Sequence, residues 1–283
     1  MSRFDDLPGY AASLGPLIDA VNLGVHIASR PLSRELAERS GLQADLLVDL
    51  RFVLPVRPLT PAGLAAVYRY NPLRRAEIDV HLAQGTLAED DAPEATPRTA
   101  PPAAPGAAPR TAPHTAPDAA PGAASGIAPG AAGTGALRAT PVTRAFIASL
   151  YEVHAAVTGR LWAAQADRLP ELAGVAGRLV EAGAATGGAA FAQVAPPYEP
   201  PGTPPGVLLF NRLAVLRYHR ADAHAGAWGR AGLTAAQMIS LPPGPVRERI
   251  EAGTNDRAAR PYETLTTRDR QAFLLGLSAL DLP

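Results

Sequence analysis

A long low-complexity segment in the middle of the chain limits what this sequence can fold into. Residues from about 92 to 136 are almost entirely Ala, Pro, Gly and Thr, and Ile127 is their one sizeable apolar side chain. Such a segment buries too little surface to offset the entropy lost on ordering, so we expect it to be disordered. It leaves about 90 residues before it and about 147 after it, each long enough for a hydrophobic core.

The charges divide unevenly between these two parts. Residues 1–91 carry 9 Arg and 12 acidic residues, a net charge of −3, and residues 137–283 carry 15 Arg and 12 acidic residues, a net charge of +3. All 26 basic residues of the chain are Arg, which is typical of GC-rich codon usage. Neither part has the large basic surplus typical of nucleic-acid-binding domains.

Several classes of site are excluded by missing residues or motifs. The chain has no Cys, so it has no disulfide, thiolate nucleophile or Cys-based zinc site. The Gly-rich run at 183–188 lacks the Lys of a phosphate-binding loop, and no G-x-S-x-G or H-E-x-x-H motif occurs. We expect no cofactor. With no signal-peptide pattern at the start and no long uninterrupted apolar run, we expect no membrane span and a cytoplasmic location.

The first part contains two helix-turn-helix patterns. An apolar stripe predicts a helix over 10–29, which Pro31 should end. Ser33 is a suitable N-cap for a helix over 34–39, and Gly41 permits a tight turn into a helix over 44–53.

The second pattern begins at Thr60, which should cap a helix through Tyr68, followed by a helix over 73–83. Residues 84–87 then indicate the exit into a strand, and residues 136–140 are a candidate for the returning strand. Two interpretations stay open for the low-complexity segment: an enlarged loop in the β-hairpin wing of a winged helix, or a linker between domains.

The second part is predicted to be a helical bundle. Its clearest helix spans 142–165, with further helices at 168–186, 206–229, 245–259 and 266–280. The expected fold is therefore mainly α. It has a winged helix-turn-helix-like domain over 1–91, a disordered segment over 92–135 and a helical bundle over 142–283, and on the hairpin interpretation 136–141 completes the wing.

The stretch Leu216–His224, read L-R-Y-H-R-A-D-A-H, resembles the motif L-R-x-H-R-G-D-G-H of a little-characterised actinobacterial family. Its members are helical and are labelled helix-turn-helix or MarR-like regulators. The resemblance covers about residues 145–265 and includes a following Ala-Gly-Leu at 231–233. Ala221 and Ala223 replace the two glycines of the motif, and 234–245 is too short for the family's helix-turn-helix. The resemblance implies an architecture more than an activity.

The helix over 206–229 is predicted to turn cationic side chains toward its apolar face. At 100° per residue, Arg217, Arg220 and His224 lie on or beside the arc of buried leucines. Guanidinium groups that are turned toward the core cost free energy of folding unless they pair with acidic groups or an anionic ligand. They would either bind a carboxylate- or phosphate-bearing small molecule or pair internally with acids such as Glu152, Asp222 or Glu251.

Three further residues are candidates for the site. His219 and Asp222 share the opposite side of the helix, where they would form a surface hydrogen bond. A metal site of His219, Asp222 and His224 is disfavoured because the two histidines lie about 140° apart around the helix. His154 lies beside the stripe of the 142–165 helix, either as a satisfied core-edge histidine or as part of the pocket.

Two functional hypotheses follow. The first is a transcriptional regulator in which Arg74 and Arg75, at the start of the 73–83 helix, contact DNA. In this hypothesis the helical bundle senses a small anionic ligand, and the protein can form a homodimer. The second is a small-molecule-binding protein or enzyme that uses the Arg/His pocket without DNA contact.

Overall fold

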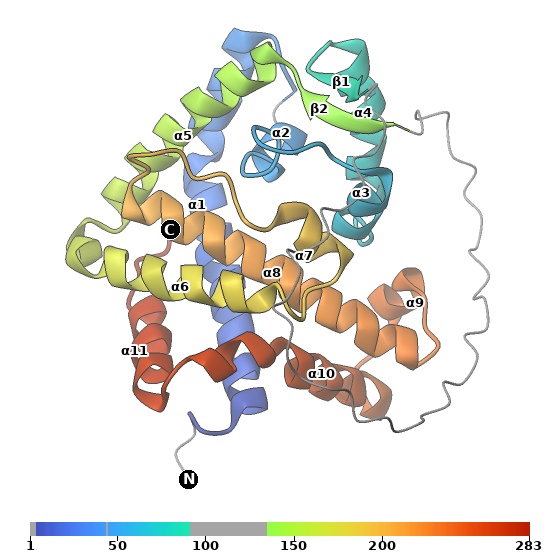
Figure 1. Ribbon diagram of the computed structural model, residues 1–283, viewed down its shortest axis with the longest axis vertical. Helices are drawn as coiled ribbons and strands as arrows, with labels where there is room; N and C mark the ends of the chain where they lie inside the picture. Colours follow the sequence, from blue (N-terminus) through green and yellow to red (C-terminus); the bar gives the residue numbers. More distant parts are fainter. Residues whose placement is uncertain (1–3, 44, 91–134) are drawn as a thin grey trace, which may run out of the picture.

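The computed structural model describes residues 4–43, 45–90 and 135–283, and within these ranges it leaves out the side chains of 72–76 and Asp90. The described chain is mostly helical (Figure 1). Its helices are α1 (Leu7–Ser40), α2 (Asp45–Asp49), α3 (Pro61–Val67), α4 (Pro72–Ala83), α5 (Pro141–Leu161), α6 (Leu169–Gly183), α7 (Ala189–Val194), α8 (Pro205–Arg230), α9 (Ala235–Ser240), α10 (Pro245–Ala258) and α11 (Thr267–Ser278). Its strands are β1 (Leu87–Asp90) and β2 (Ala136–Ala139), and short 3-10 helices cover Ala163–Arg168 and Arg260–Thr264.

Helix α1 is longer than the sequence predicts, because Pro31 does not end it. The side chain of Asp6 caps its first turn, and Gly41, at φ 65°, ends it in the left-handed conformation. The buried stripe of α1 continues past Pro31 through Ser33 and Ala37, so packing of these turns outweighs the lost hydrogen bond. Ser33 is thus inside a helix rather than at an N-cap. The separate helices expected over 34–39 and 44–53 become the end of α1 and the short α2.

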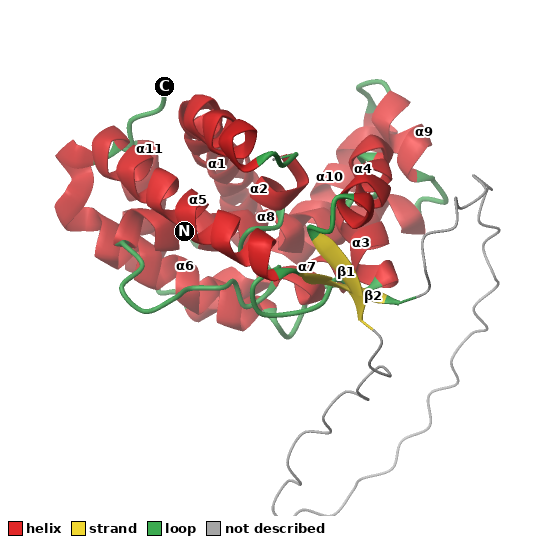
Figure 2. Cartoon of the chain, turned by 90° about the horizontal axis from the view of Figure 1, so that it is seen from above, coloured by secondary structure: helices red, strands yellow, loops and turns green. Residues whose placement is uncertain are grey.

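The second pattern of the first part has the predicted elements. Thr60 caps α3 by accepting a hydrogen bond from the Gly63 amide at 3.0 Å, and α4 follows after a short turn. Strands β1 and β2 pair antiparallel, with Leu87 opposite Ala139. Figure 2 shows this hairpin at the edge of the helical body. The two strands expected for the β-hairpin are therefore present, with residues 91–134 between them in the sequence. A winged helix-turn-helix unit is not confirmed.

Helix α8 is the centre of the second part. It packs against α6, α7, α10, α1 and α5, so neighbours surround most of its circumference. The five helices predicted from sequence are present as α5, α6, α8, α10 and α11. The short α7 and α9 were not predicted. Thr234 begins α9 with a capping box in which its hydroxyl and the Gln237 side chain each bond the other's backbone.

One hydrophobic core joins the two expected parts. It contains Leu14 and Leu47 from the first part as well as Leu150 and Leu213 from the second. Polar contacts reinforce the junction: the Tyr198 amide donates to the carbonyl of Phe52 at 2.6 Å. The boundary expected near residue 91 therefore does not separate two cores among the described residues.

Helix α1 is, by length and composition alone, apolar enough to cross a membrane, although no membrane span was expected. Core helices of other proteins meet the same criterion. Here α1 contacts α5, α8, α10 and α11, and buries one side, including Leu14, Val21 and Val25, against them.

Candidate functional site

A cleft of about 340 Å³ opens where α8 crosses α1 and α10, and we refer to it as the α8 cleft. Its lining residues come from α1, α8 and α10, from the end of α3 with the turn after it, and from the 3-10 helix Arg260–Thr264. Its described lining consists of Gly15, Ile18, Asp19, Ala66, Val67, Tyr70, Leu216, Arg217, Tyr218, Arg220, Ala221, His224, Glu251, Thr254 and Tyr262. The three cationic or basic residues predicted on the apolar side of α8 therefore line one cavity.

Arg217 binds polar groups of α1. Its Nε lies 2.6 Å from Oδ1 of Asp19, and its Nη1 donates to Oδ1 of Asn22 at 3.0 Å. The side chain of Arg217 is 45% exposed and that of Asp19 is 57% exposed. The pair is accordingly weak and open to competition from a solute.

Arg220 lies deeper in the cleft and is less completely paired. Its Nη1 donates to the amide oxygen of Asn255 at 2.9 Å, whereas its Nη2 lies 3.6 Å from Oε2 of Glu251, beyond hydrogen-bond distance. A Cβ at Gly15 would lie 2.8 Å from Nε of Arg220. The glycine in α1 thus makes room for the guanidinium, at the usual cost of a glycine inside a helix.

His224 lies in a row of polar side chains. The indole of Trp228 donates to the Tyr70 hydroxyl at 2.6 Å, and that hydroxyl lies 3.1 Å from Nδ1 of His224. Nε2 of His224 is buried without a hydrogen-bond partner among the described residues, 3.6 Å from Oε1 of Glu251. Burial lowers the pKa of His224, the opposing effect of Glu251 being smaller, so the imidazole is neutral at pH 7.

The described lining of the cleft carries no net charge. Asp19 and Glu251 balance Arg217 and Arg220, and His224 is neutral. The interpretation that the arginines pair internally holds for both, with Asp19 and Glu251 as partners. Because a cavity lies beside these pairs, the structure also provides space for a ligand. Asp19 and Tyr70 were not predicted, since they come from elements distant in sequence.

His219 and Asp222 do not lie on the surface as predicted. His219 is 4% exposed, bonds Oγ1 of Thr186 through Nε2 at 2.9 Å and packs edge-on against Phe191. Burial lowers its pKa to about 4. The element that covers His219 is α7 together with the loop before it, and α7 was not predicted from the sequence.

The Asp222 carboxylate joins α7, α8 and the end of α3. It accepts hydrogen bonds from the amides of Ala190 and Phe191 at 3.3 and 2.8 Å, and it lies 3.2 Å from Nη2 of Arg69. Its side chain is 7% exposed. Asp222 thus forms a structural ion pair and binds amides in the first turn of α7, and it is not part of the described lining of the α8 cleft.

His154 is in the core and does not line the cleft. Both of its ring nitrogens lack a hydrogen-bond partner among the described residues, so it is not the satisfied core-edge histidine of the other interpretation. Its ring and that of His26 each pack against Phe210 at 5.1 Å between centroids. Arg51, 1% exposed, lies over the same phenyl ring at 4.1 Å. This basic cluster was not predicted from the sequence.

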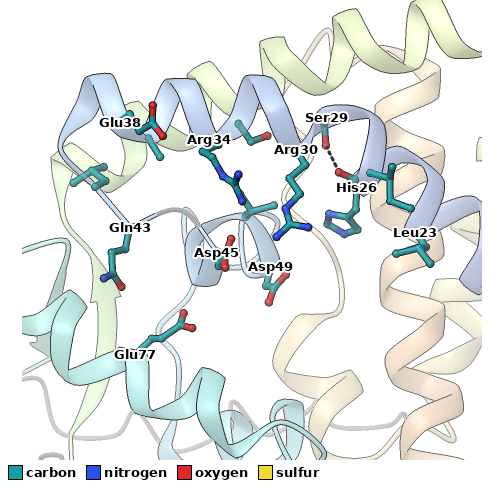
Figure 3. Close-up of a pocket in the computed structure, with 15 residues that line it drawn as sticks. Leu23, His26, Ser29, Arg30, Arg34, Glu38, Gln43, Asp45, Asp49 and Glu77 are labelled. Carbon is teal, nitrogen blue, oxygen red and sulfur yellow. Dashed lines mark hydrogen bonds between the residues drawn. The ribbon is translucent and has the colours of Figure 1, made fainter. Parts of the chain in front are cut away.

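A larger groove of about 680 Å³ lies between α1, α2 and α4 (Figure 3). Arg30 and Arg34 extend into it from α1, and Asp45 and Asp49 face them from α2. His26 also lines the groove, and burial together with the charges of Arg51 and Arg217 lowers its pKa to about 3. The groove thus presents two arginines of α1 opposite three carboxylates, those of Asp45 and Asp49 from α2 and Glu77 from α4.

Arg74 and Arg75 fall in the first turn of α4, and their side chains lie outside the described residues. Within the described ranges, no group of three His or acidic residues is arranged to hold a metal ion. Comparison with protein-family models, curated proteins and solved structures found no match.

Proposed function

We propose that this protein binds a small organic molecule through an anionic group held in the α8 cleft. The observation that carries the proposal is that two guanidinium groups and a neutral imidazole line one 340 Å³ cavity. This volume is at the lower end of the range of small-molecule sites. A carboxylate or phosphate is the natural partner of a guanidinium because the planar fork matches its oxygens.

Arg220 is the strongest candidate for the anion-binding residue. The described contacts of its guanidinium include one hydrogen bond, to the neutral amide of Asn255, so donors remain for a ligand. The rest of the lining includes Ile18, Val67, Leu216 and the rings of Tyr70 and Tyr262. Burial raises the pKa of Tyr262 to about 12, so its phenol stays neutral beside a bound anion. Such a site favours an anion attached to an apolar body.

Trp228 provides an intrinsic fluorescent reporter of ligand binding in the cleft. Trp228 donates to Tyr70, and Tyr70 lines the cleft, so a ligand that moves the Tyr70 hydroxyl changes the surroundings of the indole. We expect short-chain and aromatic carboxylates to change the tryptophan fluorescence and raise Tm. The fluorescence change should disappear in Trp228→Phe. Binding should be lost in Arg220→Gln and kept in Arg268→Gln, an exposed arginine of α11. Unaltered binding in Arg220→Gln would contradict the proposal.

DNA binding is a second proposal, supported by the order α3, α4, β1 and β2, in which a paired hairpin follows two helices. The resemblance to a family labelled MarR-like agrees with it, and the net charge of −3 over residues 1–91 opposes it. Fluorescence anisotropy of a labelled mixed-sequence duplex at low salt tests it. We expect salt-dependent binding that weakens when Arg74 and Arg75 are both replaced by Gln. No binding at low salt would remove DNA from the function, leaving a ligand-binding protein.

A further inference from the structure

We infer that the molecule bound in the α8 cleft is a zwitterion of the amino-acid type, with a carboxylate, an ammonium group and an apolar body. This inference rests on the proposed function of the cleft and specifies its ligand. It follows from the arrangement of the four charged side chains and from the unused hydrogen-bonding capacity of Glu251.

The cleft presents both signs of charge to a ligand. Arg217 lies beside Asp19, and Arg220 lies beside Glu251, all four lining the same 340 Å³ cavity. An anion without a cationic group would meet attraction from each guanidinium and repulsion from the carboxylate next to it. A zwitterion avoids this repulsion, because its ammonium group faces a carboxylate while its own carboxylate faces a guanidinium.

Glu251 is the carboxylate best placed to receive an ammonium group. Its two closest charged or basic contacts, to Arg220 and His224, are both 3.6 Å, and no described hydrogen bond ends on it. Its side chain is 42% exposed, within the lining of the cleft. By contrast, Glu199 forms two hydrogen bonds of 2.7 and 2.6 Å to Arg212. The chain therefore makes close ion pairs, including Arg217–Asp19 in the cleft itself, and the longer separation of Arg220 from Glu251 leaves Glu251 available.

The neutral state of His224 preserves the charge pattern. Burial lowers its pKa, so the imidazole adjacent to Glu251 does not neutralise that carboxylate at pH 7. The unpartnered Nε2 of His224 lies 3.6 Å from Oε1 of Glu251, beyond hydrogen-bond distance, so it leaves the carboxylate free for a ligand. The ammonium group of the ligand would therefore lie against the Glu251 carboxylate, within the cleft.

The size and walls of the cleft define the apolar part of the ligand. Ile18, Val67 and Leu216 line it together with aromatic rings, including that of Tyr262. A volume of about 340 Å³ accommodates a single amino acid with a branched aliphatic or aromatic side chain, not a dinucleotide.

Three matched probes test the inference on the full-length protein. They are L-leucine, 4-methylpentanoate, which lacks the ammonium group, and 3-methylbutylamine, which lacks the carboxylate. A parallel set of L-phenylalanine, 3-phenylpropanoate and 2-phenylethylamine covers an aromatic body. Calorimetry and Trp228 fluorescence give the dissociation constants. We expect the zwitterion of at least one set to bind about tenfold or more tightly than both of its analogues.

The outcomes separate this inference from the proposed function. If the carboxylates bind as tightly as the amino acids, the inference is wrong and anion binding stands. If no probe in either set binds, both are wrong. In the variant Glu251→Gln, we expect the affinity for the amino acid to fall about tenfold while that for the matching carboxylate is unchanged or higher. The control Glu248→Gln, on an exposed residue of α10, should leave both affinities unchanged. Equal losses for both probes in Glu251→Gln would overturn the inference, and the urea midpoint of each variant verifies that it folds.

Discussion

Replacing Asp222 tests the arrangement of α3, α7 and α8. The sequence places this residue on the outer side of α8, where substitution would change stability by less than about 0.5 kcal/mol. In the structure its carboxylate, 7% exposed, accepts hydrogen bonds from two amides of α7 and pairs with Arg69. The two interpretations therefore predict different stabilities for one substitution.

The magnitude follows from three lost contacts in Asp222→Ala. Removing a side-chain acceptor from a first-turn amide of a helix costs about 1 kcal/mol, and the second amide bond to the same charged acceptor contributes about 1 kcal/mol more. Arg69, whose side chain is 20% exposed, loses its carboxylate partner at a cost of about 1 kcal/mol. We expect the free energy of unfolding to fall by about 3 kcal/mol, which corresponds to about 6–12 °C in Tm for a domain of this size.

Urea unfolding followed by circular dichroism at neutral pH measures this difference. The matched control is Asp256→Ala, on an exposed residue of α10 with no described side-chain contact, for which we expect less than about 0.5 kcal/mol. In a double-mutant cycle with Arg69→Met, the two substitutions should couple by about 1 kcal/mol. A loss in Asp222→Ala no larger than in the control would refute the packing of α7 over α8.

Three further predictions concern the cleft and the buried basic residues. Gly15→Ala should weaken carboxylate binding about tenfold, because its Cβ would lie 2.8 Å from Nε of Arg220, whereas Gly174→Ala, with open space at Cβ, should bind normally in the same fluorescence titration. The folded-state pKa of His219, about 4, lies below its ordinary value of 6.5, so its contribution to stability is complete above pH 6.5 and is lost as the pH falls toward 4. By linkage this amounts to about 2 kcal/mol between pH 7 and pH 5, and urea titrations should show a pH dependence smaller by that amount in His219→Gln; an unchanged dependence would contradict its burial as a neutral group. Arg51→Met should raise the free energy of unfolding by about 1 kcal/mol, because two guanidinium nitrogens of this fully buried side chain have no hydrogen-bond partner among the described residues. A decrease of more than about 1 kcal/mol on the same measurement would show that the guanidinium contributes more than its desolvation costs.

The sequence by itself determined the features that depend on neighbours within a few turns. Thr60 caps α3 and Gly41 ends α1 because these residues act through backbone groups three to five positions away. The period of α8 placed Leu213 in the core and brought Arg217 and Arg220 to one side, since helical geometry fixes which residues share a face.

Only the tertiary structure decided which elements cover each face of a helix. Arg217 meets Asp19 from 198 positions away, a pairing that no local pattern encodes. His219 and the carboxylate of Asp222 are buried because α7 packs on the side of α8 that a two-sided amphipathic pattern assigns to solvent. Pro31 stays inside α1 because burial of the following turns offsets its lost hydrogen bond. Local rules determine where helices begin and which side chains share a face, whereas burial and charge pairing depend on contacts between distant segments, which exist only once the chain has folded.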